Sequence, residues 1–198
     1  MVAVPVRTAP EVALAPRARA SEVPLDLDVL YRRYAPLVGR WAIHLGGPSV
    51  DAEDVVQEVF LAAQRARPTE RSDARATTWL YRTTENIVRH QRRRNRVRRW
   101  LSGLASDVAG DLPAAEPQPL ESVEARQARE RVYAALDGMK ERERNVFILF
   151  EIEELSGQAI AEMYGAKPAT VWVWLHRARA VFHRRLAALE EKEGSNGT

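Results

Sequence analysis

The chain has 198 residues, of which 45% are hydrophobic and 29% charged, a composition that supports a packed core and argues against global disorder. It contains no cysteine, so disulfides, thiolate zinc sites and cysteine nucleophiles are excluded, as suits a reducing cytosol. The formal net charge is only +3, but positive and negative residues are segregated along the chain. Because no run of about 18 apolar residues occurs, we expect a cytoplasmic protein without membrane insertion.

Residues 1–24 are predicted to form a disordered N-terminal arm. Prolines and charged residues interrupt every candidate for the continuous apolar core of a secretory signal. A transit peptide is the alternative, and the acidic residues Glu11 and Glu22 disfavour it. The folded part is therefore expected to begin near residue 25.

Residues 25–100 are predicted to form a domain of three helices. Apolar side chains recur at helical spacing over residues 25–45, and the next helix begins near Ser49 or Asp51 and ends before Pro68. A third helix is expected over residues 76–100. Strand-like alternation is absent, so the fold class is all-α.

Residues 101–121 contain several prolines and acidic residues but no Lys or Arg, which predicts a flexible acidic linker. A second domain over residues 122–191 follows, and residues 192–198 are expected to be a disordered tail. The chain is thus predicted to be two small helical domains, of three and four helices, joined by the linker. The four helices of the second domain are expected at about 122–136, 141–151, 156–164 and 168–191.

The segment from Gln158 to Val171 has the pattern of a helix-turn-helix. Ala161 is small where two helices must cross closely, and Gly165 is suited to the left-handed conformation at the turn. Val171 is placed to hold the second helix against the first. This pattern predicts a helix that enters the DNA major groove. An ordinary helical hairpin is the alternative, and the basic stretch 177–185 argues against it.

The expected reading face of this second helix is unusually apolar. Trp172 and Val173 would pack against thymine methyl groups, where an arginine would instead read guanine. The alternative is that Trp172 and Trp174 pack on neighbouring helices. This alternative is favoured for Trp174 and stays open for Trp172. The residues expected to face the groove are Lys167, Ala169, Trp172, Val173 and His176.

Residues 89–99 include seven arginines, and so many like charges on one helix repel each other unless a polyanion is bound. Nucleic acid is therefore the predicted partner, with a merely solvated basic face as the alternative. Ahead of the arginines, Arg82 and Asn86 suit recognition of an unstacked base, with Asn86 the better candidate. Trp79 by itself is expected to belong to the core.

The helix that begins near residue 51 has the opposite charge on its first two turns. Helix-dipole complementation explains Asp51 and Glu53 well but Glu58 poorly. An acidic surface beside a basic helix predicts a basic protein partner in addition to nucleic acid.

These segments resemble the extracytoplasmic-function (ECF) subfamily of bacterial sigma factors in the sigma-70 family. Asp51–Phe60 resembles its region 2 signature, and Thr78–Arg82 with Asn86 and the arginine run resembles the part of region 2 that melts the minus-10 promoter element. Glu141–Arg179 resembles region 4, which binds the minus-35 element. The resemblance covers about residues 25–99 and 122–189. It departs from the family pattern at Trp172–Trp174, where many members have Lys-Ser-Arg.

The resemblance implies an RNA polymerase sigma factor that directs core polymerase to promoters and opens the minus-10 region. Its partners would be the polymerase β′ and β subunits, promoter DNA and an anti-sigma factor. Residues 69–75 would help to capture an unstacked promoter base. The implied polymerase-binding residues are Asp54, Gln57, Glu58 and Phe60; the minus-10 residues are Trp79, Arg82, Asn86, Arg89, Arg92, Arg93 and Arg94; and the minus-35 residues are Lys167, Thr170, Trp172, His176, Arg177 and Arg179.

Two other classes of protein are alternatives to a sigma factor. A DNA-binding regulator that acts without polymerase would use the helix-turn-helix as an operator reader. A nucleic-acid-processing enzyme would need an acid-base or metal constellation, and neither a nucleotide-binding glycine loop nor metal-ligand spacing of the histidines is found. We therefore predict no enzymatic activity, no cofactor and no metal.

Overall fold

The computed structural model describes residues 27–66, 73–104 and 122–196, and in these ranges the regular structure is entirely helical. The predicted all-α fold is confirmed. The N-terminal module consists of α1 (Leu27–Gly46), a 3-10 turn (Gly47–Ser49), α2 (Ala52–Ala66) and α3 (Asp73–Leu104). The C-terminal module consists of α4 (Val123–Asp137), α5 (Glu141–Phe147), the π-helical turn η2 (Ile148–Ile152), α6 (Gly157–Tyr164) and α7 (Pro168–Asn196).

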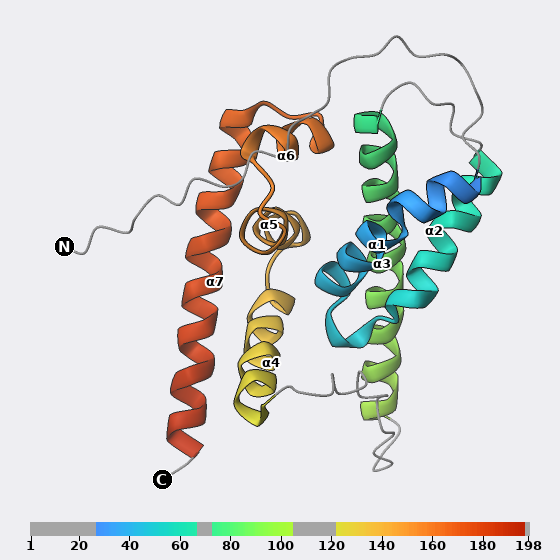
Figure 1. The fold of residues 1–198 in the computed structure, drawn as a ribbon. Helices are drawn as coiled ribbons and strands as arrows, with labels where there is room; N and C mark the ends of the chain where they lie inside the picture. The colour runs from blue at the N-terminus through green and yellow to red at the C-terminus, as the bar shows by residue number, and fades with distance from the viewer. Residues whose placement is uncertain (1–26, 67–72, 105–121, 197–198) are drawn as a thin grey trace.

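The N-terminal module is held together by the apolar faces of its three helices. In Figure 1, α1 and α2 lie across the long α3. Val38, Trp41 and Leu45 of α1 are buried, as the helical spacing predicts. The Asp51 carboxylate caps α2 by accepting hydrogen bonds from the backbone N–H groups of Glu53 and Asp54, at 2.9 and 3.1 Å.

The C-terminal module is built on α7, against which α4, α5 and α6 pack. The rings of Phe147 and Phe182 stack with centroids 4.4 Å apart, which fixes α5 on α7. Ser122 and Ser156 cap α4 and α6, since each hydroxyl accepts a hydrogen bond from a backbone N–H three residues on. These caps match the expected helix starts.

Two helices are longer than the sequence pattern predicts. Helix α3 begins at Asp73 and ends at Leu104, where the prediction was 76–100. Helix α7 continues to Asn196, past the expected end at residue 191. Helix ends assigned from a sequence pattern are uncertain by a few residues, because the last turns have few apolar positions to mark them. The predicted N-terminal arm lies outside the described residues, as does the linker beyond Leu104.

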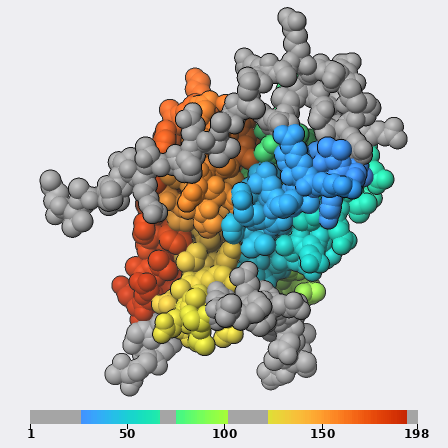
Figure 2. All heavy atoms as spheres, in the orientation of Figure 1, coloured from blue at the N-terminus to red at the C-terminus, as the bar shows by residue number. Residues whose placement is uncertain are grey.

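The two modules are in contact along one side. Figure 2 shows the blue and cyan atoms of the N-terminal module abutting the yellow and orange atoms of the C-terminal module. Helix α3 packs against α6, and α1 packs against η2. An aromatic chain crosses the boundary, because Tyr81 of α3 meets Trp41 and Tyr164 edge-on, with ring centroids at 5.4 and 6.0 Å.

Candidate nucleic-acid interface

Helices α6 and α7 form a helix-turn-helix with the geometry that the sequence predicts. Gly165 has φ 60°, a left-handed conformation that residues with a side chain adopt at a cost. The backbone N–H of Ala166 donates to the carbonyl of Ala161 at 2.8 Å, which closes the end of α6. Ala161 and Val171 are buried where the two helices cross. These contacts fix the angle at which α7 leaves the turn.

The first three turns of α7 leave most of the predicted minus-35 residues accessible. Lys167, Trp172, His176, Arg177 and Arg179 are exposed, and Thr170 is half-buried. Among them, Arg179 is already engaged by its own module. Its Nε lies 2.6 Å from a carboxylate oxygen of Glu151.

The two tryptophans of α7 have different surroundings. Trp172 is 50% exposed and its other side covers Phe150 and Gly157, so it both packs on the module and reaches solvent. Trp174 packs inside the module, edge-on to Tyr164 at 5.9 Å and beneath the Arg142 guanidinium at 4.9 Å. Of the two tryptophans, Trp172 is therefore the more accessible to a ligand.

The predicted minus-10 residues lie on α3, where the C-terminal module already engages three of them. Arg82 donates from Nε to the carbonyl of Met163 at 3.0 Å, and its guanidinium lies over the Tyr164 ring. Arg89 is 3.6 Å from Glu141, and Arg92 is 2.6 Å from Asp137.

The other minus-10 candidates have fewer partners. Asn86 is exposed and accepts a hydrogen bond from Arg89. Arg93 and Arg94 are exposed. Trp79 is half-buried against the core, in line with the expectation that it packs inside the protein.

Glu85, which the sequence analysis did not single out, lies at the centre of the contact between the modules. Its Oε1 accepts hydrogen bonds from Asn145 Nδ2 at 2.8 Å and from the Tyr164 hydroxyl at 2.9 Å. The Tyr164 hydroxyl also meets that of Tyr81 at 2.8 Å. Burial and the nearby Glu85 carboxylate raise the pKa of Tyr164 above its ordinary value, so its hydroxyl keeps the proton that it donates.

A second carboxylate, Glu153, joins η2 to α1. Its Oε2 lies 2.8 Å from Arg40 Nε, and its Oε1 pairs with His44 Nδ1. Burial acts to raise the pKa of Glu153, but the hydrogen bonds from His44 and Arg40 outweigh burial and the pKa lies below its ordinary value. His44 lies in the last turn of α1, so this contact ties the end of α1 to the C-terminal module.

The predicted polymerase-binding residues of α2 divide into two groups. Asp54, Gln57 and Glu58 are exposed on the outer face of the helix, and Glu58 also accepts a hydrogen bond from Gln91 at 3.1 Å. Phe60 is 6% exposed and meets the Tyr31 ring edge-on at 4.8 Å. The acidic surface of α2 is thus presented to solvent from a helix that Phe60 anchors.

The part of the chain that the structure describes contains neither a metal-binding cluster nor a membrane-spanning helix. No group of three or more His, Asp or Glu residues is arranged to hold a metal ion. None of the described helices is both long and apolar enough to span a membrane.

Comparisons with known proteins decide the family. Residues 30–98 match the model described as Sigma-70 region 2, and residues 129–181 match Sigma-70, region 4. The chain is 33% identical over 161 residues to the ECF RNA polymerase sigma factor SigE of Mycolicibacterium smegmatis, covering 81% of this chain and 61% of that longer relative. It is 32% identical over 167 residues to the RNA polymerase sigma factor CnrH of Cupriavidus metallidurans, covering 82% and 87%. This chain is an ECF sigma factor. The sigma factor therefore belongs to the transcription initiation factors that direct RNA polymerase to promoters, as its sequence predicts.

Solved structures of two sigma factors share the fold. RpoE in complex with the anti-sigma factor NepR from Bartonella quintana has a TM-score of 0.54 at 21% identity, covering 79% of this chain and 94% of that one. CnrH in complex with the cytosolic domain of CnrY has a TM-score of 0.53 at 24% identity, covering 84% and 88%. At such identities the likeness concerns the fold alone.

Proposed function

We propose that this sigma factor docks on core RNA polymerase through the exposed acidic residues of α2, reads the minus-35 element with α7 and opens the minus-10 element with α3. The observation that carries this proposal is the separation of two surfaces of opposite charge. Asp54 and Glu58 project from the N-terminal module, whereas Lys167, His176 and Arg177 project from the C-terminal one. A basic partner and a DNA duplex are therefore bound on different parts of the molecule.

The minus-35 role of α7 rests on its exposed first turns. Trp172 offers an apolar edge for a thymine methyl group, and Lys167 and His176 flank it with polar groups. Arg177 and Arg179 follow on the same helix and suit the phosphates, provided that Arg179 exchanges Glu151 for DNA.

The minus-10 role of α3 requires a change of partners. Arg82, Arg89 and Arg92 contact the C-terminal module, so their guanidinium groups reach DNA only when the modules separate. Binding to core polymerase would supply the free energy for this separation, because a ligand shifts an equilibrium toward the state that it binds more tightly.

An anti-sigma factor is the proposed regulator. RpoE of Bartonella quintana was solved in complex with the anti-sigma factor NepR, and CnrH in complex with the cytosolic domain of CnrY; both share this fold. The proposed role is binding alone, with no catalytic residue contributed by the sigma factor.

Run-off transcription on genomic fragments with purified core polymerase tests the proposal. The wild-type protein is expected to yield discrete transcripts that core polymerase alone does not yield. The double variant Asp54→Asn, Glu58→Gln should bind core polymerase more weakly, while Glu124→Gln, Glu130→Gln on α4 removes the same charge and should not. Absence of any transcript, together with a duplex footprint by the protein alone, would instead indicate a regulator that works without polymerase.

A further inference from the structure

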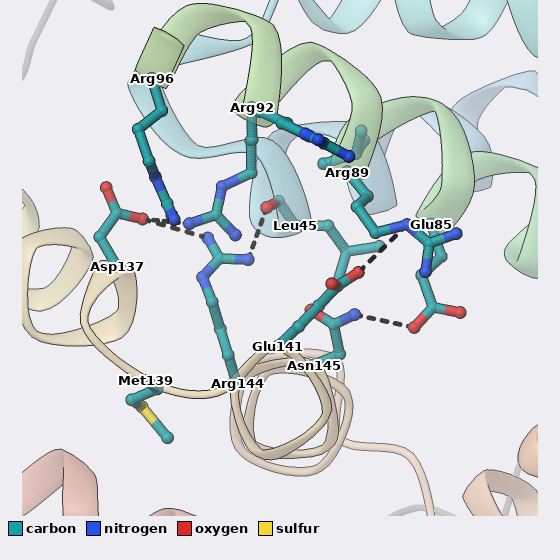
Figure 3. Close-up of a pocket in the computed structure, with 12 residues that line it drawn as sticks. Leu45, Glu85, Arg89, Arg92, Arg96, Asp137, Met139, Glu141, Arg144 and Asn145 are labelled. Carbon is teal, nitrogen blue, oxygen red and sulfur yellow. Dashed lines mark hydrogen bonds and ion pairs between the residues drawn. The ribbon is translucent and has the colours of Figure 1, made fainter. Parts of the chain in front are cut away.

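A pocket of about 340 Å³ lies between α3 and the start of the C-terminal module, and arginines dominate its wall. Arg89, Arg92, Arg93 and Arg96 share one face of α3, because their spacing is i, i+3, i+4 and i+7. Arg144 of α5 completes the set from the opposite side. Figure 3 shows the side chains of Arg92 and Arg96 directed from α3 toward Asp137, with Arg144 reaching the same point from below.

The carboxylates in this pocket do not balance its arginines. Five arginines line it with only three carboxylates, and one of these, Glu85, is engaged by Asn145 and Tyr164. Within the described residues, Arg93 and Arg96 make no hydrogen bond or ion pair. Like charges at this helical spacing repel each other, so a bound anion would lower the energy of the cluster.

Arg144 gives an independent indication of an anion. Its side chain is 1% exposed, and Nη1 donates to the carbonyl of Leu45 at 2.6 Å. Its Nε and Nη2 have no hydrogen-bond partner among the described residues, and the nearest carboxylate oxygen of Asp137 is 3.9 Å away. Burial, followed by the repulsion from Arg92, lowers the pKa of Arg144 to about 10. A buried guanidinium with unused donors is costly, and a further acceptor in the pocket would offset this cost.

We propose that this pocket binds a small anion carrying a diphosphate group, either free or as part of a nucleotide. Planar guanidinium groups match phosphate oxygens in pairs, and the pocket is at the lower end of the size range of small-molecule sites, about 300–1,000 Å³. The ligand would join α3 to α5 and so hold the two modules together. The ligand would also compete with promoter DNA, because both need the same arginines of α3. This competition rests on the proposed function.

Isothermal titration of the full chain with inorganic pyrophosphate tests the site directly. The double variant Arg93→Ala, Arg96→Ala is expected to weaken binding at least tenfold. The matched variant Arg98→Ala, Arg99→Ala removes the same charge from residues of α3 that do not line the pocket, and should change binding less than twofold. A second arm with a nucleoside diphosphate identifies the source, since tighter binding than pyrophosphate assigns a nucleotide and equal binding assigns the free diphosphate.

Equal losses of affinity in the two double variants would contradict the site, because non-specific attraction to an arginine-rich helix predicts equal losses. No measurable binding of pyrophosphate by the wild type would also contradict it. A second measurement keeps this outcome separate from failure of the proposed function. Binding of a forked promoter duplex to the polymerase holoenzyme, assembled with and without pyrophosphate, reports competition. Promoter binding that pyrophosphate leaves unchanged would remove the competition while the sigma-factor role stands.

Discussion

Helices α3 and α7 are both predicted to bind promoter DNA and both are rich in arginine. Their predicted DNA-binding residues differ in whether they face solvent or contact the other module. Lys167, just before α7, and His176 on α7 face solvent, with Trp172 between them in the sequence. On α3, Arg82 and Arg92 contact the other module. One helix is ready to bind, and the other is occupied by its own chain. Arginine content therefore indicates affinity for a polyanion, but not whether the surface is available.

The occupied face of α3, which carries Arg82, Arg89 and Arg92, is held against the C-terminal module by contacts of unequal strength. The exposed pair Arg89–Glu141 contributes about 0–1 kcal/mol, as such pairs do in water. The hydrogen bonds at Glu85 and the aromatic contact of Tyr81 with Tyr164 are more sheltered, so each is expected to contribute more. Variants that remove these contacts one at a time should turn the occupied face into an available one.

The largest effect is expected from loosening the packing of α7, the helix that carries the available face. Leu175 of α7 is 1% exposed, and Leu175→Ala should lower the free energy of unfolding by about 2–5 kcal/mol through lost burial and a cavity. Urea unfolding checks the value. The matched change Leu101→Ala removes a side chain that is 54% exposed, and should stay within about 0.5 kcal/mol of the wild type. Similar losses in both variants would contradict the observed packing of α7.

The next largest effect should come from Tyr164→Phe, which removes the hydroxyl shared by Glu85 and Tyr81. The contact between the modules is expected to weaken by about 1–3 kcal/mol, because a half-buried carboxylate loses a donor. Since the chain has no cysteine, spin labels on Gln64→Cys and Ala180→Cys report the separation of the modules.

The labelled Tyr164→Phe variant should show a longer and broader distance distribution between the two labels. Tyr31→Phe is the control, since Tyr31 is 48% exposed and lies within the N-terminal module. An unchanged distribution in Tyr164→Phe would mean that Glu85 does not hold the modules together.

A smaller effect is expected from Asp137→Asn, which weakens the ion pair with Arg92. Releasing this arginine should raise the affinity of the free protein for a forked minus-10 duplex about threefold, the equivalent of roughly 0.7 kcal/mol. Glu130→Gln removes the same charge from α4, where Glu130 pairs within the helix with Arg126. Equal gains in the two variants would show that net charge, and not the release of Arg92, determines the affinity.

The smallest effect is a pH dependence that Glu153 controls. Its pKa is depressed below the ordinary 4.5, so the stability that it contributes is complete above about pH 4.5 and is lost as the pH falls through the folded-state value. Urea midpoints measured from pH 6 to pH 3.5 should fall more steeply in the wild type than in Glu153→Gln. Parallel curves would mean that the contact of Glu153 with Arg40 and His44 adds no pH-dependent stability.

The sequence predicted what depends on local patterns. The left-handed Gly165 and the buried Ala161 and Val171 follow from spacing within one motif, as does the exposed start of α7. Helix ends were less exact, because α3 and α7 both continue past the position where the sequence pattern placed their ends.

Contacts between the modules could not be predicted in this way. Glu85 and Tyr164 are 79 positions apart, and Arg144 meets the carbonyl of Leu45 from 99 positions away. Helical periodicity identifies which face of a helix is apolar, but it does not say which distant helix will cover a polar residue at the edge of that face. The occupied state of α3 therefore emerged only from the structure.

The π-helical turn Ile148–Ile152 has a consequence for how the gene tolerates changes in length. Its wide turn is marked by the bond from the N–H of Glu153 to the carbonyl of Ile148 at 2.9 Å, five residues back. Loss of a single codon here would close this turn to an ordinary α-helical turn, so the residues after it would keep nearly the same orientation toward α1. In a regular α-helix the same loss would rotate everything after it by about 100°. An in-frame deletion that disrupts most helices should therefore leave Glu153 facing Arg40 and His44 of α1.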